Sequence, residues 1–216
     1  MSFFVRVNTQ LLEASRYTLG LFVLTLVIAI PLGILVAACA LSRFRPIRYA
    51  TNTFIWIVRG TPLMLQIIVV MYGPGLLLGI PIKSQFLVAV IAFGINYAAY
   101  FAEIYRGGIL SMPKGQYEAG TVLGLSRAQI NGRIVLPQVV KRITPAMGNE
   151  IITLVKDTSL ASVIGISEII MTAKGIVATS AIIWPLFYTA VFYLVMCGVL
   201  TLVFKAIEKR MNYYKV

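Results

Sequence analysis

The sequence predicts an all-α membrane protein with several transmembrane helices. Of its 216 residues, 59% are hydrophobic and only 12% are charged, and the mean hydropathy is +0.90. A soluble domain is about 45–50% apolar and roughly 25% charged, so this chain has too few polar residues to cover a body in water. Uncharged stretches are also long enough to cross a bilayer, which takes about 20 residues as a helix. These observations exclude a disordered chain, a collagen-like rod and a coiled coil.

Uncharged or nearly uncharged stretches predict five spans in a single transmembrane domain, residues 1–216; the second span contains Arg59 and the fourth contains Glu150. Their approximate positions are 17–42, from before Arg59 to about Met71, 84–102, around 143–155, and 184–204. The fourth must extend beyond its apolar part to reach the length that a bilayer requires. The stretch 160–174 is apolar but short and contains glycine, so we expect it to be only partly inserted.

The distribution of lysine and arginine predicts the orientation of these spans. Five spans place the two termini on opposite sides of the membrane. Thirteen of the 19 Lys and Arg residues then fall on one side and five on the other, with Arg59 inside a span. Because cytoplasmic loops are enriched in Lys and Arg, we expect the N-terminus outside and the C-terminus in the cytoplasm. The net charge of +12 is thereby explained without a nucleic-acid partner.

Residue types that carry catalysis or bind metals are scarce. The chain has no histidine, and its two cysteines, Cys39 and Cys197, lie in separate apolar stretches. No G-x-x-x-x-G-K-[ST] phosphate-binding loop is present. We therefore predict no catalytic residue, no metal site and no cofactor bound by this chain.

The longest polar loop, residues 106–137, is predicted to contain two short helices. Pro113 opens the first, and Gly124 stands where a helix C-terminus favours a residue that tolerates left-handed dihedral angles. Ser126 to Gln129 forms a capping box that starts the second. The next span is expected to begin after Pro137. Two short helices at an angle make a stiff loop that can transmit force to a partner protein.

A motif in this loop resembles the cytoplasmic EAA loop of ABC importer permeases. It consists of Glu118-Ala119-Gly120, three residues, Gly124, nine residues, and Ile134-Val135-Leu136-Pro137. The chain departs from the family pattern at Gly120, where the pattern has alanine. Four further motifs resemble the polar amino acid (histidine, lysine, arginine, glutamine) branch of these permeases: Arg59-Gly60-Thr61-Pro62-Leu63, Ala102-Glu103-Ile104 with Arg106-Gly107-Gly108-Ile109, Gly115-Gln116, and Lys156-Asp157-Thr158-Ser159-Leu160.

The resemblance, which covers about residues 17–210, implies a type I ABC importer permease rather than an enzyme. Two permeases, identical or paired with a sister, would sit on a cytoplasmic ATPase dimer that uses ATP and Mg²⁺. An extracytoplasmic binding protein would deliver the substrate, and the complex would lie in the inner membrane of a prokaryote. In the family the first loop helix fits a groove on the ATPase. The resemblance thus implies coupling contacts from Gln116, Glu118, Ala119, Gly120, Leu123 and Gly124.

Polar side chains inside the spans are candidates for substrate binding. A carboxylate at membrane depth costs about 2.5–3.5 kcal/mol on insertion scales, so Glu150 should face a cavity or a partner. It could bind the cationic group of an amino acid, or form an internal ion pair with Arg59 or Lys156. Asn96 could bind the backbone groups of an amino acid, or a neighbouring helix.

Two further candidates flank the kink expected at Pro62. Proline removes a backbone hydrogen bond and frees carbonyl groups that can line a cavity. By resemblance to the family, Thr61 and Gln66 border the central pocket. Ordinary packing polarity is the alternative explanation for both.

We predict that the chain moves a polar, basic L-amino acid inward by alternating access, driven by a separate ATPase. The acidic residue at position 150 resembles permeases for basic amino acids. A permease for cystine or a neutral amino acid is the nearest alternative. A passive channel, which needs no ATPase, and a membrane scaffold, which moves no solute, are alternatives of other classes.

Overall fold

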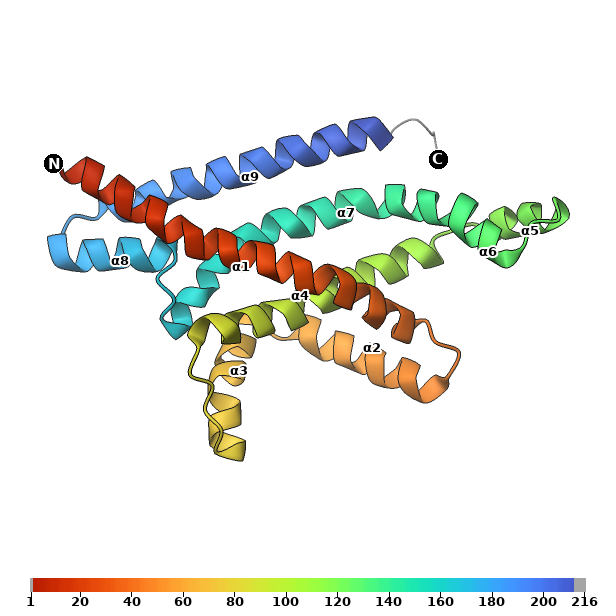
Figure 1. Ribbon diagram of the computed structural model, residues 1–216, viewed down its shortest axis with the longest axis horizontal. Coiled ribbons are helices and arrows are strands. Elements are labelled where there is room, and N and C mark those ends of the chain that lie inside the picture. Colours follow the sequence, from red (N-terminus) through yellow and green to blue (C-terminus); the bar gives the residue numbers. More distant parts are fainter. Residues whose placement is uncertain (1, 212–216) are drawn as a thin grey trace.

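A computed structural model describes residues 2–211, which are almost entirely helical and contain no β-strand. The long helices α1 (Phe3–Ala40), α4 (Gln85–Leu110), α7 (Leu136–Asp157) and α9 (Trp184–Met211) run lengthwise through the molecule (Figure 1). The all-α prediction is confirmed.

Three helices, α1, α4 and α9, are long and apolar enough to cross a membrane on their own. Two further candidate spans are bent pairs of helices. One joins α2 (Arg45–Gly60) to α3 (Leu63–Leu78) at 108°, and the other joins the segment 127–164 to α8 (Ile169–Ser180) at 52°. Counting each bent pair as one span gives the predicted five.

The second span differs from the prediction of one kinked helix ending near Met71. The chain leaves the helix at Thr61, which is extended with φ −118° and ψ 144°, and α3 then continues to Leu78. The residue before a proline is pushed out of helical geometry, so Pro62 ends α2 instead of bending it. The result is a sharp corner in place of a kink.

The approach to α7 also differs from the prediction. Ser126 forms the expected capping box with Gln129 and opens α6 (Arg127–Gln129). The chain continues through the π-helical turns Ile130–Val135 directly into α7, so the second loop helix is not separate and does not end at Pro137. The wide π turns accommodate the proline ring, which would clash with a regular helical turn.

The second bent pair turns near a residue whose backbone dihedral angles are left-handed. After α7 the chain forms a 3-10 helix, Thr158–Ile164, which ends at Gly165 with φ +82°. The expected partly inserted stretch 160–174 therefore contains this helix, the turn at Gly165 and the first half of α8.

Helix α4 lies at the centre of the core and packs along α1. Its Phe93 and Phe101 are fully buried, and the close approach of α1 depends on Gly33. A Cβ atom at Gly33 would lie 2.9 Å from the Phe101 Cβ and 3.2 Å from the Ala98 carbonyl oxygen. By contrast, the most apolar window of α9 is unburied.

The two ends of the molecule carry different segments. The end of α1, the start of α2, the short helices α5 (Lys114–Val122) and α6, the start of α7 and the end of α9 lie at one end (Figure 1). The start of α1 and α8 lie at the other. The segments predicted to be cytoplasmic thus share one end, while their side of the membrane stays a prediction.

Candidate functional site

A polar cavity of about 520 Å³ lies where the corner between α2 and α3 meets α4 and α7. Thr61, Asn96 and Glu150, three of the four predicted substrate residues, line it together. The remaining wall is formed by Arg59, Gly60, Pro62, Leu63, Tyr97, Tyr100, Thr153, Asp157 and Leu160.

Gln66, the fourth predicted residue, lies behind the cavity wall and holds the corner. Its Nε2 donates to the Val58 carbonyl oxygen at 2.7 Å and to the Thr61 Oγ1 at 2.9 Å, and the Thr61 hydroxyl donates to the Ile57 carbonyl oxygen at 2.9 Å. The break at Pro62 leaves carbonyl groups without helical partners, and these side chains satisfy them. Gln66 thus supports the site rather than lining it with Glu150.

Asn96 links this support to the cavity. It is only 4% exposed, and its Nδ2 donates to the Gln66 Oε1 at 3.0 Å. Within residues 2–211 its Oδ1 accepts no hydrogen bond. That oxygen is an acceptor available to a ligand in the cavity.

Two carboxylates from α7 face the cavity, and they differ in their partners. Asp157 accepts a hydrogen bond from the Tyr97 hydroxyl at 2.7 Å. For Glu150, the described residues place no Lys or Arg nitrogen within 4.0 Å, so neither of the ion pairs considered from the sequence, with Arg59 or with Lys156, is formed. Glu150 is half-buried and uncompensated at short range.

Arg59 is held away from Glu150 by α4. Its Nη1 lies 3.9 Å from the Glu103 carboxylate, and its guanidinium lies 5.2 Å from the centre of the Tyr100 ring. Glu103 also accepts two hydrogen bonds from Arg106, at 2.6 and 2.9 Å. The Glu103 carboxylate thus pairs closely with Arg106, and Arg59 lies at the edge of ion-pair distance.

The sequence reasoning missed Tyr97. This residue is 2% exposed, and its hydroxyl holds Asp157 at the cavity wall. A signal was available, because a tyrosine in an apolar span needs a hydrogen-bond partner for its hydroxyl. Nothing in the sequence, however, indicated which of the seven acidic residues would meet it.

The loop at the far end of α4 is a second candidate site, and a small apolar core lies beneath it. Helix α5 ends before Gly124, whose φ of +73° confirms the predicted left-handed position. A small core of Met112, Ile130, Val135 and Val139 lies beneath the loop. Arg142 ties its base to α4 by donating to the Ser111 carbonyl oxygen at 2.5 Å.

Packing explains why glycine replaces the alanine of the family pattern at position 120. A Cβ atom there would lie 2.7 Å from the Ile130 Cγ1 and 2.9 Å from its Cδ1. The Ile130 side chain therefore occupies the space of the missing methyl group.

The predicted coupling residues divide into an exposed and an internal set. Glu118, Ala119, Leu123 and Gly124 are exposed, and Leu123 and its neighbour Val122 are 74% and 87% exposed. Gly120 is buried against Ile130, and the Gln116 Oε1 accepts a hydrogen bond from the Gln138 Nε2 at 3.2 Å. The exposed set presents an apolar end and a carboxylate to solvent.

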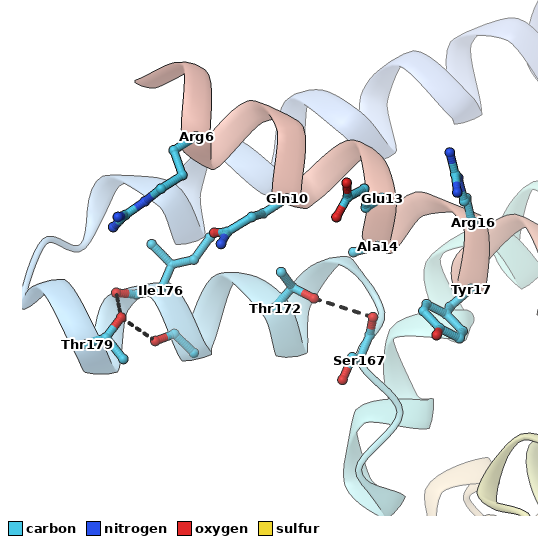
Figure 2. A pocket seen from close by; sticks show the side chains of 11 residues that line it. Arg6, Gln10, Glu13, Ala14, Arg16, Tyr17, Ser167, Thr172, Ile176 and Thr179 are labelled. Atoms are coloured by element: carbon cyan, nitrogen blue, oxygen red, sulfur yellow. Dashed lines mark hydrogen bonds between the residues drawn. The ribbon is translucent and has the colours of Figure 1, made fainter. Parts of the chain in front are cut away.

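Another polar cavity, of about 640 Å³, lies at the opposite end between the start of α1 and α8. Figure 2 shows Arg6 and Gln10 reaching from α1 toward α8, while Arg16 points away from it. None of the predicted site residues lies there.

Comparisons with known proteins agree with this geometry. Residues 29–213 match the family described as "Binding-protein-dependent transport system inner membrane component". The chain is 38% identical to the arginine transport system permease protein ArtQ of Bacillus subtilis (strain 168), over 94% of this chain and 92% of the relative. It is 36% identical to the L-cystine transport system permease protein TcyB of the same organism, over 92% and 85%.

A solved structure of an amino acid ABC transporter with histidines has the same fold. It superposes with a TM-score of 0.89 at 31% identity and covers 96% of each chain. With the family match and these relatives, the chain belongs to the inner membrane permease components of binding-protein-dependent ABC transporters, in the amino acid transport branch.

Proposed function

We propose that this chain is the permease subunit of an ATP-driven importer that moves a basic L-amino acid inward across the cytoplasmic membrane. The observation that carries the substrate class is Glu150, a half-buried carboxylate that faces the cavity with no ion-pair partner within 4.0 Å among the described residues. A relative at 38% identity is named for arginine transport, which supports the same class.

The charges of the cavity complement those of a basic amino acid. At neutral pH such a molecule carries two cationic groups and one carboxylate. The cavity wall carries two carboxylates, Glu150 and Asp157, and one guanidinium, Arg59. Asn96 adds an amide oxygen that can accept from an ammonium group. A neutral amino acid would leave one carboxylate without a cation, which is costly at membrane depth.

We propose that a separate ATPase dimer docks on α5 and supplies the energy. Val122 and Leu123 are the apolar end of a helix held rigidly by the core beneath it, and Glu118 adds a charge for basic groups of the partner. A second copy or a sister permease would complete the pathway, and an extracytoplasmic binding protein would deliver substrate at the N-terminal end. In this arrangement the C-terminus is cytoplasmic.

Transport would follow alternating access between an outward-open and an inward-open state. The binding protein stabilises one state and ATP the other, each by its differential affinity for the two. The corners at Pro62 and Gly165 are the breaks in the transmembrane helices where segments can reorient.

The test is uptake into liposomes that contain the full chain together with its partner ATPase, with the partner binding protein added outside. Labelled arginine is added outside and ATP is enclosed inside. Glu150→Gln should lower arginine uptake by about tenfold or more, since a desolvated ion pair loses one partner. Glutamine uptake, if present, should fall less.

Glu208→Gln provides the matched control, because it removes a carboxylate of α9 that lies outside the substrate cavity and the coupling loop. Its arginine uptake should match that of the wild type. Unchanged arginine uptake in Glu150→Gln would overturn the substrate assignment. Uptake that proceeds without ATP would overturn the importer and favour a passive channel.

Cystine is a second candidate substrate, because a relative at 36% identity is named for it. Cystine also carries two ammonium groups, but it has two carboxylates, for which the cavity offers the single guanidinium of Arg59. Preferential uptake of labelled cystine over arginine would favour this alternative.

A further inference from the structure

A cavity of about 370 Å³ lies between α7 and α9 at the end of the molecule that carries α5. Lys141 comes from α7, and Lys205 and Lys209, one helical turn apart, come from α9. The Thr144 hydroxyl also lines it and donates to the Val140 carbonyl oxygen at 2.7 Å. This cavity is separate from the substrate cavity and from the coupling loop.

The cavity has an excess of positive charge. Among residues 2–211, three lysines and one acid, Glu208, line it. In the part of the chain that the structure describes, no carboxylate oxygen lies within 4.0 Å of any of these three ammonium groups. Three lysines that line one cavity without an ion pair fit an anion with several oxygen atoms, such as a phosphate.

The position of the cavity along α9 places it at the level of lipid headgroups. Trp184, at the other end of α9, lies in an aromatic cluster with Phe3, Phe4 and Tyr188, as is typical of a membrane interface. From Trp184 to Lys205 the helix rises about 30 Å, which equals the thickness of the hydrocarbon core. Lys205 therefore stands at the opposite interface.

The outer face of α9 is apolar directly beside the lysines. The most hydrophobic window of this helix is unburied, and its exposed side chains lead from the cavity toward the membrane centre: Leu194, Val195, Val199, Leu202 and Val203. A soluble phosphate would use the lysines alone. A phospholipid would use the lysines for its headgroup and this face for its acyl chains.

We propose that the cavity between α7 and α9 binds the headgroup of an anionic phospholipid, with the phosphate held by Lys141, Lys205 and Lys209. The lipid fills the groove between the ends of the two helices. The inference goes beyond the proposed function, because it depends neither on the transported amino acid nor on the ATPase.

The experiment measures lipid adducts on the full chain by native mass spectrometry in detergent. Phosphatidylglycerol is titrated against phosphatidylcholine of the same chain length, and inorganic phosphate forms a third arm. Each lysine near an anionic surface contributes about fivefold to binding, so K205Q/K209Q should weaken phosphatidylglycerol binding by about thirtyfold. K83Q/K174Q, which removes two exposed lysines from outside the cavity, should retain wild-type binding.

K205R/K209R keeps both charges and should bind phosphatidylglycerol with at least half of the wild-type affinity. This variant tests the proposal even if the glutamine substitutions disturb folding. If K205Q/K209Q and K83Q/K174Q lost phosphatidylglycerol binding equally, the proposed site would be overturned. Binding of phosphatidylcholine as strong as that of phosphatidylglycerol would also overturn it. Adducts of inorganic phosphate without adducts of phosphatidylglycerol would assign the cavity to a soluble anion and overturn the proposed lipid site.

Discussion

The loop proposed for ATPase coupling and the cavity proposed for substrate binding lie at different depths of the same bundle and are built differently. In the loop, Gly120 and Ile130 fit so closely that a single methyl group would clash. In the cavity, Glu150 and the Asn96 Oδ1 have no partner among the described residues. The loop is closely packed at this contact, whereas the cavity leaves polar groups unpaired.

This contrast fits the two tasks that we propose for these regions. A loop that transmits force must not deform, and close packing gives it stiffness. A cavity that binds a polar solute needs groups that gain their partners only when the ligand arrives, because a buried group already paired offers nothing to it. Substitutions in the loop should therefore affect all substrates equally, whereas substitutions at the cavity should change selectivity.

The largest effect is expected from Gly124→Val. A β-branched residue at φ +73° costs about 1–2 kcal/mol and would displace the end of α5 from its partner. Uptake of every transported amino acid into proteoliposomes should fall at least about tenfold.

Gly132→Val is the matched control, since a Cβ atom at Gly132 meets nothing within 4 Å and its φ is ordinary. Its uptake should stay within twofold of wild type. A Gly124→Val chain that loses uptake of one substrate only would contradict the division between loop and cavity.

The next effect is expected from Gln66→Leu at the cavity. The change leaves the Asn96 amide without its partner and the Val58 carbonyl oxygen with only the 3.5 Å contact of the Thr61 hydroxyl. Each unsatisfied group costs about 1–3 kcal/mol. We expect a lower unfolding temperature and a several-fold change in the ratio of arginine to glutamine uptake. An equal fall in the uptake of arginine and of glutamine would indicate that Gln66 affects stability alone.

A smaller effect is expected from Gly120→Ala, which restores the family residue. Overpacking against Ile130 costs about 1–3 kcal/mol, offset by about 1 kcal/mol of helix propensity, so stability should fall by about 1 kcal/mol. Chemical unfolding of the full chain in detergent measures it. In a chain that also carries Ile130→Ala, Gly120→Ala should stabilise the protein, because the clash is removed. Strictly additive effects of the two substitutions on stability would show that residues 120 and 130 are not in contact.

The smallest effect is expected from Gln138→Leu at the start of α7, where Gln138 contacts Gln116 of α5. The bond to Gln116 is long, at 3.2 Å, and the core beneath α5 remains intact. Stability should change by less than about 1 kcal/mol and uptake by less than twofold. A loss as large as that of Gln66→Leu would show that the loop depends on its polar contacts.

Much of the fold could be predicted because it follows from local signals. Apolar length predicted the spans, and Gly124 and Ser126 marked the ends of the loop helices. The corner at Pro62 and the π turns before Pro137 could not be predicted. A proline interrupts the hydrogen bonding of a helix. Its neighbours in space decide whether the helix bends, ends or widens into π turns.

The candidate site was predicted only in part. Thr61, Asn96 and Glu150 were found because polar groups are rare and costly in apolar helices, and the structure brings them to one cavity. Gln66 was grouped with them for the same reason but supports the corner instead. Tyr97 was missed, because its role depends on Asp157, 60 residues away in the chain.

The sequence alone determined that the chain is helical, that it is suited to a membrane and that a capped loop interrupts its spans, because composition, helix signals and motif spacing are properties of neighbouring residues. The tertiary structure decided which carboxylate stays unpaired, which glutamine holds the corner and which isoleucine fills the space at Gly120. These outcomes depend on distances between helices that lie far apart in the chain, and no local pattern specifies those distances.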